Sequence, residues 1–270
     1  MDIASPSSTD HFLLALQAYQ ELQAEIDPQA CPAPAEVEAP APDLEPATAP
    51  DGSLLLGLAE DGLPLVLNLY DPSPGPILVA GEARSGKTSY LHSLAQATDR
   101  FDPGEIQFGA LTPFPEEWQA VESLPGCMGV WPTYHPSGVN FLRQLIDWAD
   151  ALMDSRQIVL LLIDGLEMLS QQDGQFRQDL RWLLSYGPER HVWPVVAAHP
   201  GRLSRLDRWL EYFPTRILGT VRQPQVARML VDDPEINLAR LIPCRQFGLW
   251  MPGTWMKFWA LPTGYERETP

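Results

Sequence analysis

Three apolar runs stand out in the pattern of hydrophobic and polar residues, at residues 77–80, 158–163 and 192–198. Runs of this length without alternation are typical of strands buried on both faces, as in parallel sheets. Segments with helical spacing of apolar residues lie between them. The pattern therefore predicts an α/β fold, with a mostly parallel central sheet flanked by helices.

Shorter patterns complete the predicted domain. Residues 53–70 form two apolar stretches around the turn at 60–62, which predicts a β-hairpin ahead of the first buried strand. Helical and strand periodicities predict the remaining elements. Helices are expected at 89–98, around 118, at 139–153 and at 175–184, further strands at 105–111 and 128–131, and a second hairpin at 247–261.

The front of the chain differs from the rest and divides it into three parts. Apolar residues at helical spacing predict an amphipathic N-terminal helix within residues 1–27. Residues 28–50 are mainly proline, alanine and acid, which predicts a disordered, extended linker. The folded domain is expected at 51–270. We expect the helix and the acidic tether to bind this domain or a protein partner, because an acidic segment is repelled by anionic lipid.

The net charge of −17 comes mostly from this front part. Residues 1–83 carry 14 acidic and no basic side chains, whereas the rest carries 21 acidic and 18 basic ones. The folded domain is thus close to neutral, and the overall charge says little about its partners.

Composition also bears on the cellular compartment. The N-terminus lacks the basic segment of a signal peptide, and no apolar run is long enough to span a membrane. Cys31, Cys127 and Cys244 are far apart and form no CxxC pair. These features predict a cytoplasmic protein with no direct membrane insertion, no disulfide framework and no zinc site.

Residues 81–88, GEARSGKT, match the P-loop spacing G-x-x-x-x-G-K-[ST] between a predicted strand and a predicted helix. Glycines let the backbone turn so that its N–H groups face phosphate oxygens, and the helix N-terminus adds a positive dipole. Lys87 is predicted to bind the β and γ phosphates, and Thr88 a magnesium ion. The predicted nucleotide-binding residues are Gly81, Glu82, Ala83, Arg84, Ser85, Gly86, Lys87, Thr88 and Ser89.

Asp164 ends the longest apolar run and is the second candidate for chemistry. A parallel strand of this kind places its last carboxylate at the edge of the sheet where ligands bind. Beside a P-loop, that carboxylate is expected to hold the magnesium shell together with Thr88. The alternative is an ordinary turn residue in the Asp-Gly pair that ends the strand.

Two further residues are candidates with open alternatives. His199 follows the strand at 192–198 and is interpreted either as a sensor of the γ-phosphate or as a surface turn residue. Arg216 lies in the arginine-rich segment 202–245. It is interpreted either as part of a solvated face or as an arginine finger that acts on a neighbouring subunit.

From about residue 51 to 261 the chain resembles the FtsK/SpoIIIE/HerA branch of P-loop ATPases, including the ATPase modules of type VII secretion. The resemblance rests on the stretch LPLVLNLYDPSPGPILVAG before the P-loop, and on HVWPVVAAHPGRL followed by YFPTRILGTVRQPQVARML. It implies a RecA-like P-loop NTPase core with ATP and Mg²⁺ as cofactors. It also implies a homo-oligomeric ring, usually a hexamer, that moves DNA or polypeptide.

The chain departs from that family at two positions. Working members place a Glu directly after the strand-ending Asp to orient the attacking water, whereas this chain has Gly165. The nearest acid is Glu167, and loss of a positioned base can cost orders of magnitude in rate. The sensor Gln of the family is replaced by His199. Whether ATP is hydrolysed or only bound therefore stays open.

Three functions are compatible with these residues. The first is a motor ATPase that translocates DNA, although a nucleic-acid binder normally shows a basic footprint. The second is an ATP-dependent assembly, regulatory or secretion subunit with impaired hydrolysis. The third is a signalling-type switch ATPase, because LLIDGLEML resembles the D-G-L-D-E box of that class.

Overall fold

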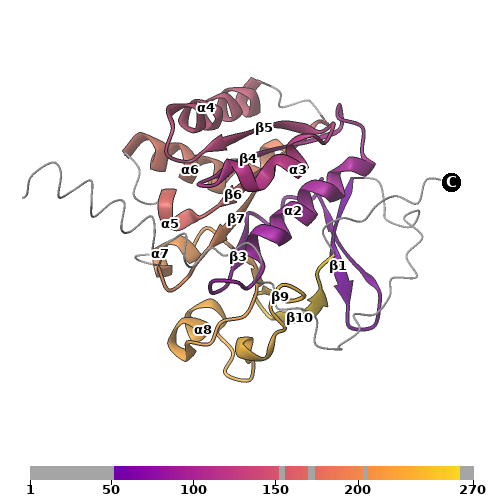
Figure 1. Ribbon diagram of the computed structural model, residues 1–270, viewed down its shortest axis with the longest axis vertical. Coiled ribbons are helices and arrows are strands. Elements are labelled where there is room, and N and C mark those ends of the chain that lie inside the picture. The colour runs from indigo at the N-terminus through magenta and orange to yellow at the C-terminus, as the bar shows by residue number, and fades with distance from the viewer. Residues whose placement is uncertain (1–51, 152–155, 170–173, 203–205, 262–270) are drawn as a thin grey trace, which may run out of the picture. The chain divides into compact units, whose positions relative to one another are not determined.

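The computed structural model describes residues 52–151, 156–169, 174–202 and 206–261 (Figure 1). The predicted N-terminal helix at 1–27 and the linker at 28–50 lie outside the described residues.

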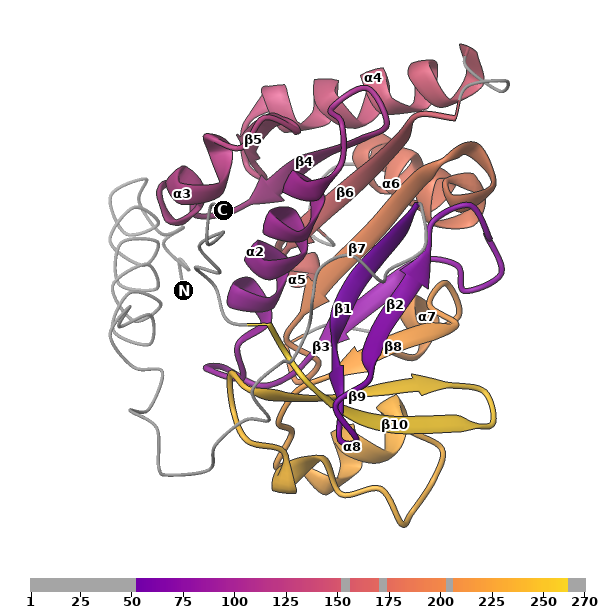
Figure 2. The ribbon, with the colours of Figure 1, turned by 90° about the vertical axis from the view of Figure 1, so that its right-hand side faces the viewer.

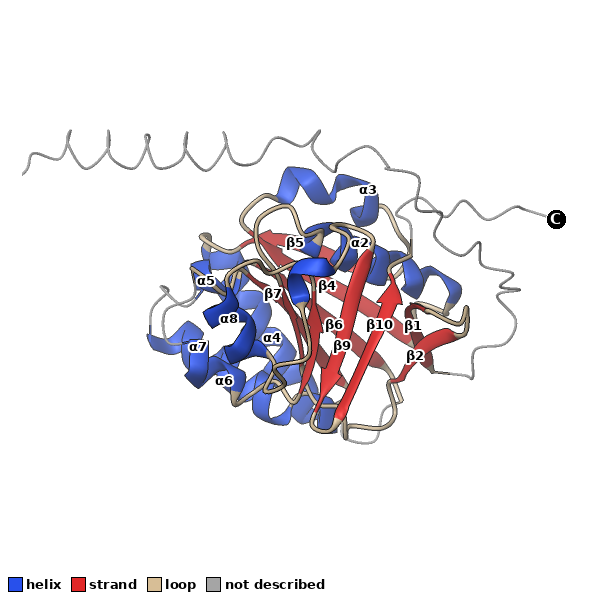
Figure 3. Ribbon diagram, turned by 90° about the horizontal axis from the view of Figure 1, so that it is seen from below, coloured by secondary structure: helices blue, strands red, loops and turns tan. Residues whose placement is uncertain are grey.

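One mixed sheet of ten strands forms the centre of the domain, in the order β2-β1-β10-β9-β8-β3-β7-β6-β4-β5. The strands from β8 to β5 run parallel, whereas β9, β10, β1 and β2 pair antiparallel (Figure 3). This confirms the predicted α/β class. The strands are β1 (Ser53–Ala59), β2 (Pro64–Asn68), β3 (Ile77–Ala80), β4 (Ile106–Thr112), β5 (Cys127–Pro132), β6 (Ile158–Asp164), β7 (Val192–Ala198), β8 (Thr215–Leu218), β9 (Gln246–Met251) and β10 (Thr254–Trp259).

Helices cover both faces of the parallel part of the sheet, with α2 and α3 on one side and α4 and α6 on the other (Figure 3). The α-helices are α2 (Lys87–Ala97), α3 (Gln119–Glu122), α4 (Pro136–Ala151), α5 (Leu166–Leu169), α6 (Gly174–Tyr186), α7 (Leu206–Leu210) and α8 (Pro224–Leu230). The 3-10 turns are η2 (Thr98–Arg100), η3 (Pro115–Trp118), η4 (Pro188–Arg190) and η5 (Leu238–Arg240).

Strand alternation divides the hydrophobic core into two clusters. In β3, Leu78 and Ala80 belong to the cluster under α4 and α6, whereas Ile77 and Val79 belong to the cluster under α2. All four side chains are buried. Because successive side chains of a strand point to opposite faces, a strand covered on both faces must be apolar throughout. This is why β3, β6 and β7 read as unbroken apolar runs.

The helix that follows the P-loop is fixed to the antiparallel part of the sheet. Figure 2 shows α2 beside β1, and the buried Tyr90 hydroxyl donates to the carbonyl of Leu56 at 3.1 Å. Leu91 and Leu94 of the same helix are buried, and each fully buried leucine contributes roughly 2 kcal/mol. The helix that carries Lys87 and Thr88 is therefore anchored on one long face.

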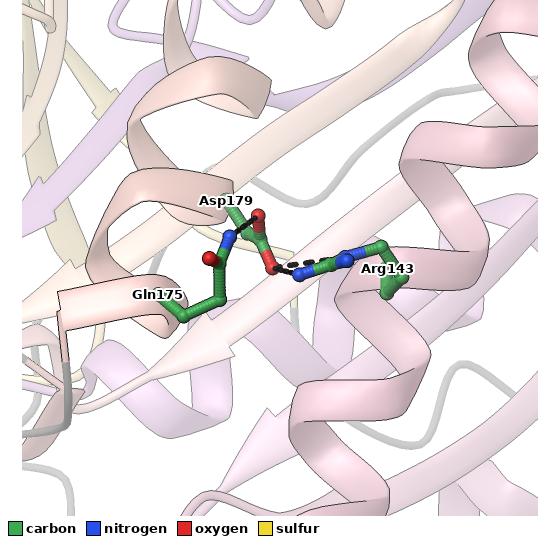
Figure 4. A network of polar contacts seen from close by, with 3 residues as sticks. All are labelled: Arg143, Gln175 and Asp179. Carbon is green, nitrogen blue, oxygen red and sulfur yellow. Dashed lines mark hydrogen bonds and ion pairs between the residues drawn. The ribbon is translucent and has the colours of Figure 1, made fainter.

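A polar network joins α4 to α6 on the opposite side (Figure 4). The buried Asp179 carboxylate accepts from the Arg143 guanidinium at 2.9 Å and from the Gln175 side-chain amide at 2.8 Å. A buried carboxylate needs such partners, because leaving it unpaired costs several kcal/mol. The network lies on the helical layer, away from the P-loop motif, and we assign it a structural role.

Element boundaries differ from the predictions by a few residues. The helix predicted at 89–98 begins at Lys87, and the one predicted at 139–153 is found at Pro136–Ala151. The sequence 136–138, Pro-Ser-Gly, lacks the apolar spacing used to find the helix, but proline fits the first turn of a helix. No helix in the described ranges is long and apolar enough to cross a membrane.

The cysteine spacing predicted no disulfide framework, but one of the three cysteines, Cys244, is nevertheless paired. This residue is disulfide-bonded, while Cys127 is free. Distance along the sequence does not limit distance in space, so the wide separation of the cysteines could not exclude a pair.

Candidate nucleotide-binding site

The loop from Gly81 to Gly86 joins β3 to α2 at the carboxyl edge of the parallel strands. Gly86 has φ +92°, and a Cβ there would lie 2.6 Å from Cys244 Cα. A Cβ on Gly81 would lie 2.3 Å from Ser85 Oγ. Neither position can therefore carry a side chain without a shift of its neighbours. Steric contacts therefore explain why both motif positions are glycine in this chain.

The side chain of Lys87 contacts the backbone of the predicted phosphate-binding loop. Its ammonium group donates to the carbonyl of Glu82 at 3.0 Å. Burial lowers the pKa of Lys87, while the nearby carboxylates of Asp164 and Glu167 act in the opposite direction. A cation that is largely removed from water and held by a carbonyl is suited to exchange that carbonyl for a phosphate oxygen.

Thr88 and Asp164 meet at the sheet edge. The Thr88 hydroxyl donates to Asp164 Oδ2 at 2.8 Å. Asp164 is the last residue of β6 and is 8% exposed, and burial raises its pKa against the lowering effects of Thr88 and Lys87. A buried carboxylate beside a hydroxyl can take part in the oxygen shell of a magnesium ion.

No group of three or more His, Cys, Asp or Glu side chains that could hold a metal occurs in the described part of the chain. Magnesium usually keeps several waters and is bound by one or two protein oxygens together with substrate phosphates. Thr88 and Asp164 supply two oxygens of this kind, so they would bind magnesium only together with the phosphates of a bound nucleotide.

Gly165 turns the chain from β6 into α5 with φ +89°. Residues other than glycine are strained at this φ, so a glutamate could not replace Gly165 without cost. Glu167 follows this turn on the first turn of α5. Burial raises the pKa of Glu167, the charge of Lys87 lowers it, and the charge of Asp164 raises it further. Glu167 Oε2 accepts from the backbone N–H of His199 at 3.1 Å.

His199 follows the last residue of β7, beside β3. Its Nδ1 is buried and has no hydrogen-bond partner among the described residues. Burial lowers the pKa of His199, and the charges of Lys87 and Arg202 lower it further. The structure therefore places an imidazole with an unpartnered buried ring nitrogen at the carboxyl end of β7, next to the strand that leads into the P-loop.

Some of the other P-loop residues are exposed to solvent, and one is buried. Ala83 and Arg84 are exposed, and Arg84 has φ +62°. Ser89 is exposed on the first turn of α2. Ser85 is buried, and its hydroxyl has no partner among the described residues. An unpartnered buried hydroxyl in a loop of this type is available to a ligand.

Arg216 is not brought together with these residues. Its guanidinium donates to the carbonyls of Phe213 at 3.2 Å, Leu230 at 2.7 Å and Leu210 at 3.3 Å. It also lies over the Trp250 ring, 4.3 Å from the centroid. All of these partners belong to the same chain.

Sequence reasoning missed Glu117 on η3. Burial raises its pKa, and the charge of Asp164 raises it further. The parallel pairing of β4 with β6, Leu111 opposite Ile163, brings the loop after β4 to the same edge as Asp164. A prediction of that strand order could have pointed to this loop, but no local motif marks Glu117.

No protein-family profile and no curated protein matches the chain. Solved structures do share its fold. EssC (ATPases 2 and 3) from Geobacillus thermodenitrificans superposes with a TM-score of 0.67 at 14% identity, covering 88% of this chain and 49% of that one. The chain thus shares the α/β fold of the ATPase domains in that structure. The resemblance predicted from the sequence is thus confirmed at the level of the fold.

Two other structures with this fold were determined with a ligand. Thermomonospora curvata EccC (ATPases 2 and 3), in complex with a signal sequence peptide, gives a TM-score of 0.60 at 15% identity over 81% of this chain and 41% of that one. The pCW3 conjugation coupling protein TcpA with ATPγS gives 0.58 at 14% identity over 79% and 67%. The chain thus spans about half or less of the EssC and EccC structures.

Proposed function

We propose that the domain binds ATP with magnesium as an FtsK-like ATPase. The observation that carries this proposal is the joint placement of Lys87, Thr88 and Asp164 around a loop whose glycines have no room for a side chain. TcpA, which shares the fold, was determined with ATPγS. Magnesium, when bound, neutralises charge on the phosphates.

The roles follow from the contacts of each residue. Lys87 exchanges the Glu82 carbonyl for the β and γ phosphates, and the loop amides of residues 82–89 bind phosphate oxygens. Thr88 and Asp164 hold the magnesium shell. His199 donates from its free ring nitrogen toward the γ-phosphate. Support for this last role comes from the unpartnered Nδ1 beside Lys87.

We further propose slow hydrolysis with Glu167 as the residue that orients water. Glu167 lies on the first turn after β6 and close to Lys87, and its raised pKa suits a proton acceptor. The Glu167 carboxylate also accepts a hydrogen bond from the backbone N–H of His199, the proposed sensor. The positive φ at Gly165, which favours glycine, supports a site that relies on Glu167 instead of a side chain at position 165.

A homo-oligomeric ring that moves DNA or polypeptide is the corresponding assembly. EccC was solved with a signal sequence peptide and TcpA is a conjugation coupling protein, so proteins of both kinds share this fold, and the choice between DNA and polypeptide stays part of the proposal. The in-chain bonds of Arg216 favour a structural role over an arginine finger. The N-terminal helix and acidic tether remain proposed as the segment that binds a protein partner.

The second candidate function is an ATP-dependent assembly or secretion subunit that binds ATP without turnover. Gly165, in place of the expected Glu, is the observation that favours it. Here nucleotide stabilises a subunit interface and hydrolysis contributes nothing.

Turnover of Glu167→Gln protein separates the two functions. The amide keeps the shape of the side chain but is a poor base, so we expect kcat for ATP to fall by roughly a hundredfold or more with little change in ATP binding. Both are measured with and without double-stranded DNA, and the exposed Glu105→Gln serves as the matched control. Tight binding without measurable turnover in the unaltered chain would instead establish the second function.

A further inference from the structure

Glu82 joins the P-loop to the segment that leads from β8 into α8. Its backbone N–H donates to the carbonyl of Thr220 at 3.0 Å. Its carboxylate Oε1 accepts from the backbone N–H groups of Arg222 at 2.7 Å and Gln223 at 3.1 Å. One residue of the loop therefore makes three hydrogen bonds to residues 220–223, which are about 140 positions away in the sequence.

The same residue is also the resting partner of the P-loop lysine. The Glu82 carbonyl accepts from Lys87 Nζ at 3.0 Å and from the backbone N–H of Ser85 at 3.2 Å. When Lys87 turns to a phosphate, one of these two bonds is lost. The carbonyl of Glu82 then loses its bond to Lys87, while the Glu82 carboxylate stays bound to the amides of Arg222 and Gln223.

Repulsion keeps the Glu82 carboxylate at those amides. A carboxylate in a phosphate-binding loop is repelled by a bound triphosphate, and charge-assisted bonds to backbone N–H groups are about twice as strong as neutral ones. The side chain is therefore expected to hold residues 222 and 223 in both nucleotide states, so that a shift of the loop carries these residues with it.

Helix α8 is fixed at both ends by such contacts. Glu82 binds the amide of Gln223, which is the N-cap of α8. Arg216 donates to the carbonyl of Leu230, the last residue of the helix. A negative group at the start and a positive group at the end both suit the helix dipole. The exposed side of this segment carries Arg222 and Met229.

We propose that Glu82 is a positioning residue that transmits phosphate binding at Lys87 to residues 220–230. The inference rests on the proposed ATP binding and adds to it: the surface formed by α8 responds to the nucleotide through one side chain. A purely structural role would make Glu82 necessary for stability but would leave the response of α8 to ATP intact.

Hydrogen exchange of residues 222–230, with and without ATPγS and magnesium, tests the proposal. In the unaltered chain, nucleotide is expected to change the exchange of this segment. In Glu82→Ala, exchange at Arg222 and Gln223 is expected to be roughly tenfold faster, as loss of charge-assisted hydrogen bonds predicts, and to be the same with and without ATPγS. Affinity for the nucleotide is measured in parallel, and the exchange of each protein is compared at saturating ATPγS, so that weaker binding is not mistaken for a lost response.

Two further variants sharpen the result. Glu82→Gln keeps an oxygen acceptor without the charge and is expected to retain part of the response, whereas the exposed Glu105→Ala keeps all of it. An unchanged response in Glu82→Ala protein that binds ATPγS overturns this inference alone. Failure of the unaltered chain to bind ATPγS overturns the proposed function, and this inference with it.

Discussion

Burial sets the ionisation of the residues at the candidate site. It raises the pKa of Asp164 and Glu167 and lowers that of Lys87, because removal from water disfavours charge of either sign. The attraction between Lys87 and the two carboxylates offsets the cost of burying these charges only in part. A metal ion beside Asp164 and a phosphate beside Lys87 would each stabilise the charged forms, so the site is best satisfied when both are present.

The chemistry of single residues was predictable where a short motif encodes it. The spacing from Gly81 to Thr88 and the apolar run that ends at Asp164 pointed to the residues that the structure places together. The contact of Glu82 with the amide of Arg222 was not predictable, because no local pattern links residues so far apart. The same holds for Glu117, which only strand order brings to this edge.

His92 on α2 makes stability depend on pH. Its ring contacts Trp118 edge-on at 4.5 Å between centroids, and burial lowers its pKa from 6.5 to about 4. The unfolded chain therefore binds a proton more readily than the folded one. The contribution of neutral His92 is fully present above pH 6.5 and is lost as the pH falls toward 4, by at most about 3 kcal/mol.

Unfolding in denaturant at pH 7 and pH 4.5 measures this loss. We expect His92→Gln to lose less stability than the unaltered chain between the two pH values. The exposed His135→Gln is the matched control and should behave like the unaltered chain. Equal losses in all three proteins would contradict the account of His92.

At the scale of elements, β8 and α8 depend on side-chain contacts to main-chain groups. Helix α8 has seven residues, and isolated helices of that length are unstable in water. Its N-cap Gln223 makes no side-chain capping bond. The carboxylate of Glu82 and the guanidinium of Arg216 replace the missing local interactions. Neither the length of this helix nor a local capping residue accounts for its stability.

Arg216→Ala is expected to destabilise the domain by about 2 kcal/mol, because three carbonyls lose a charged donor and Trp250 loses its cation. Arg216→Lys restores the charge but not the fork of donors and should recover only part. Denaturant unfolding measures both effects. Unchanged stability of Arg216→Ala, together with lost turnover, would instead support an arginine finger.

At the scale of the whole molecule, strand pairing was the part that the sequence could not provide. The apolar runs predicted the buried strands, and turn residues predicted both hairpins. The hairpin of β1 and β2 nevertheless joins the sheet through β10, with Leu58 opposite Trp259. Such a pairing depends on contacts across the full length of the domain, which a pattern with period two or 3.6 does not record.

The central claim is that the loop around Lys87 binds a triphosphate. The chain has only two lysines, Lys87 and Lys257, so Lys257→Ala is a natural control. Equilibrium binding of labelled ATP with magnesium is the most direct measurement. We expect Lys87→Ala to weaken binding by roughly ten- to a hundredfold, as loss of a half-buried charged donor predicts, and Lys257→Ala to leave it unchanged. Equal ATP affinity of Lys87→Ala and the unaltered chain would contradict the account.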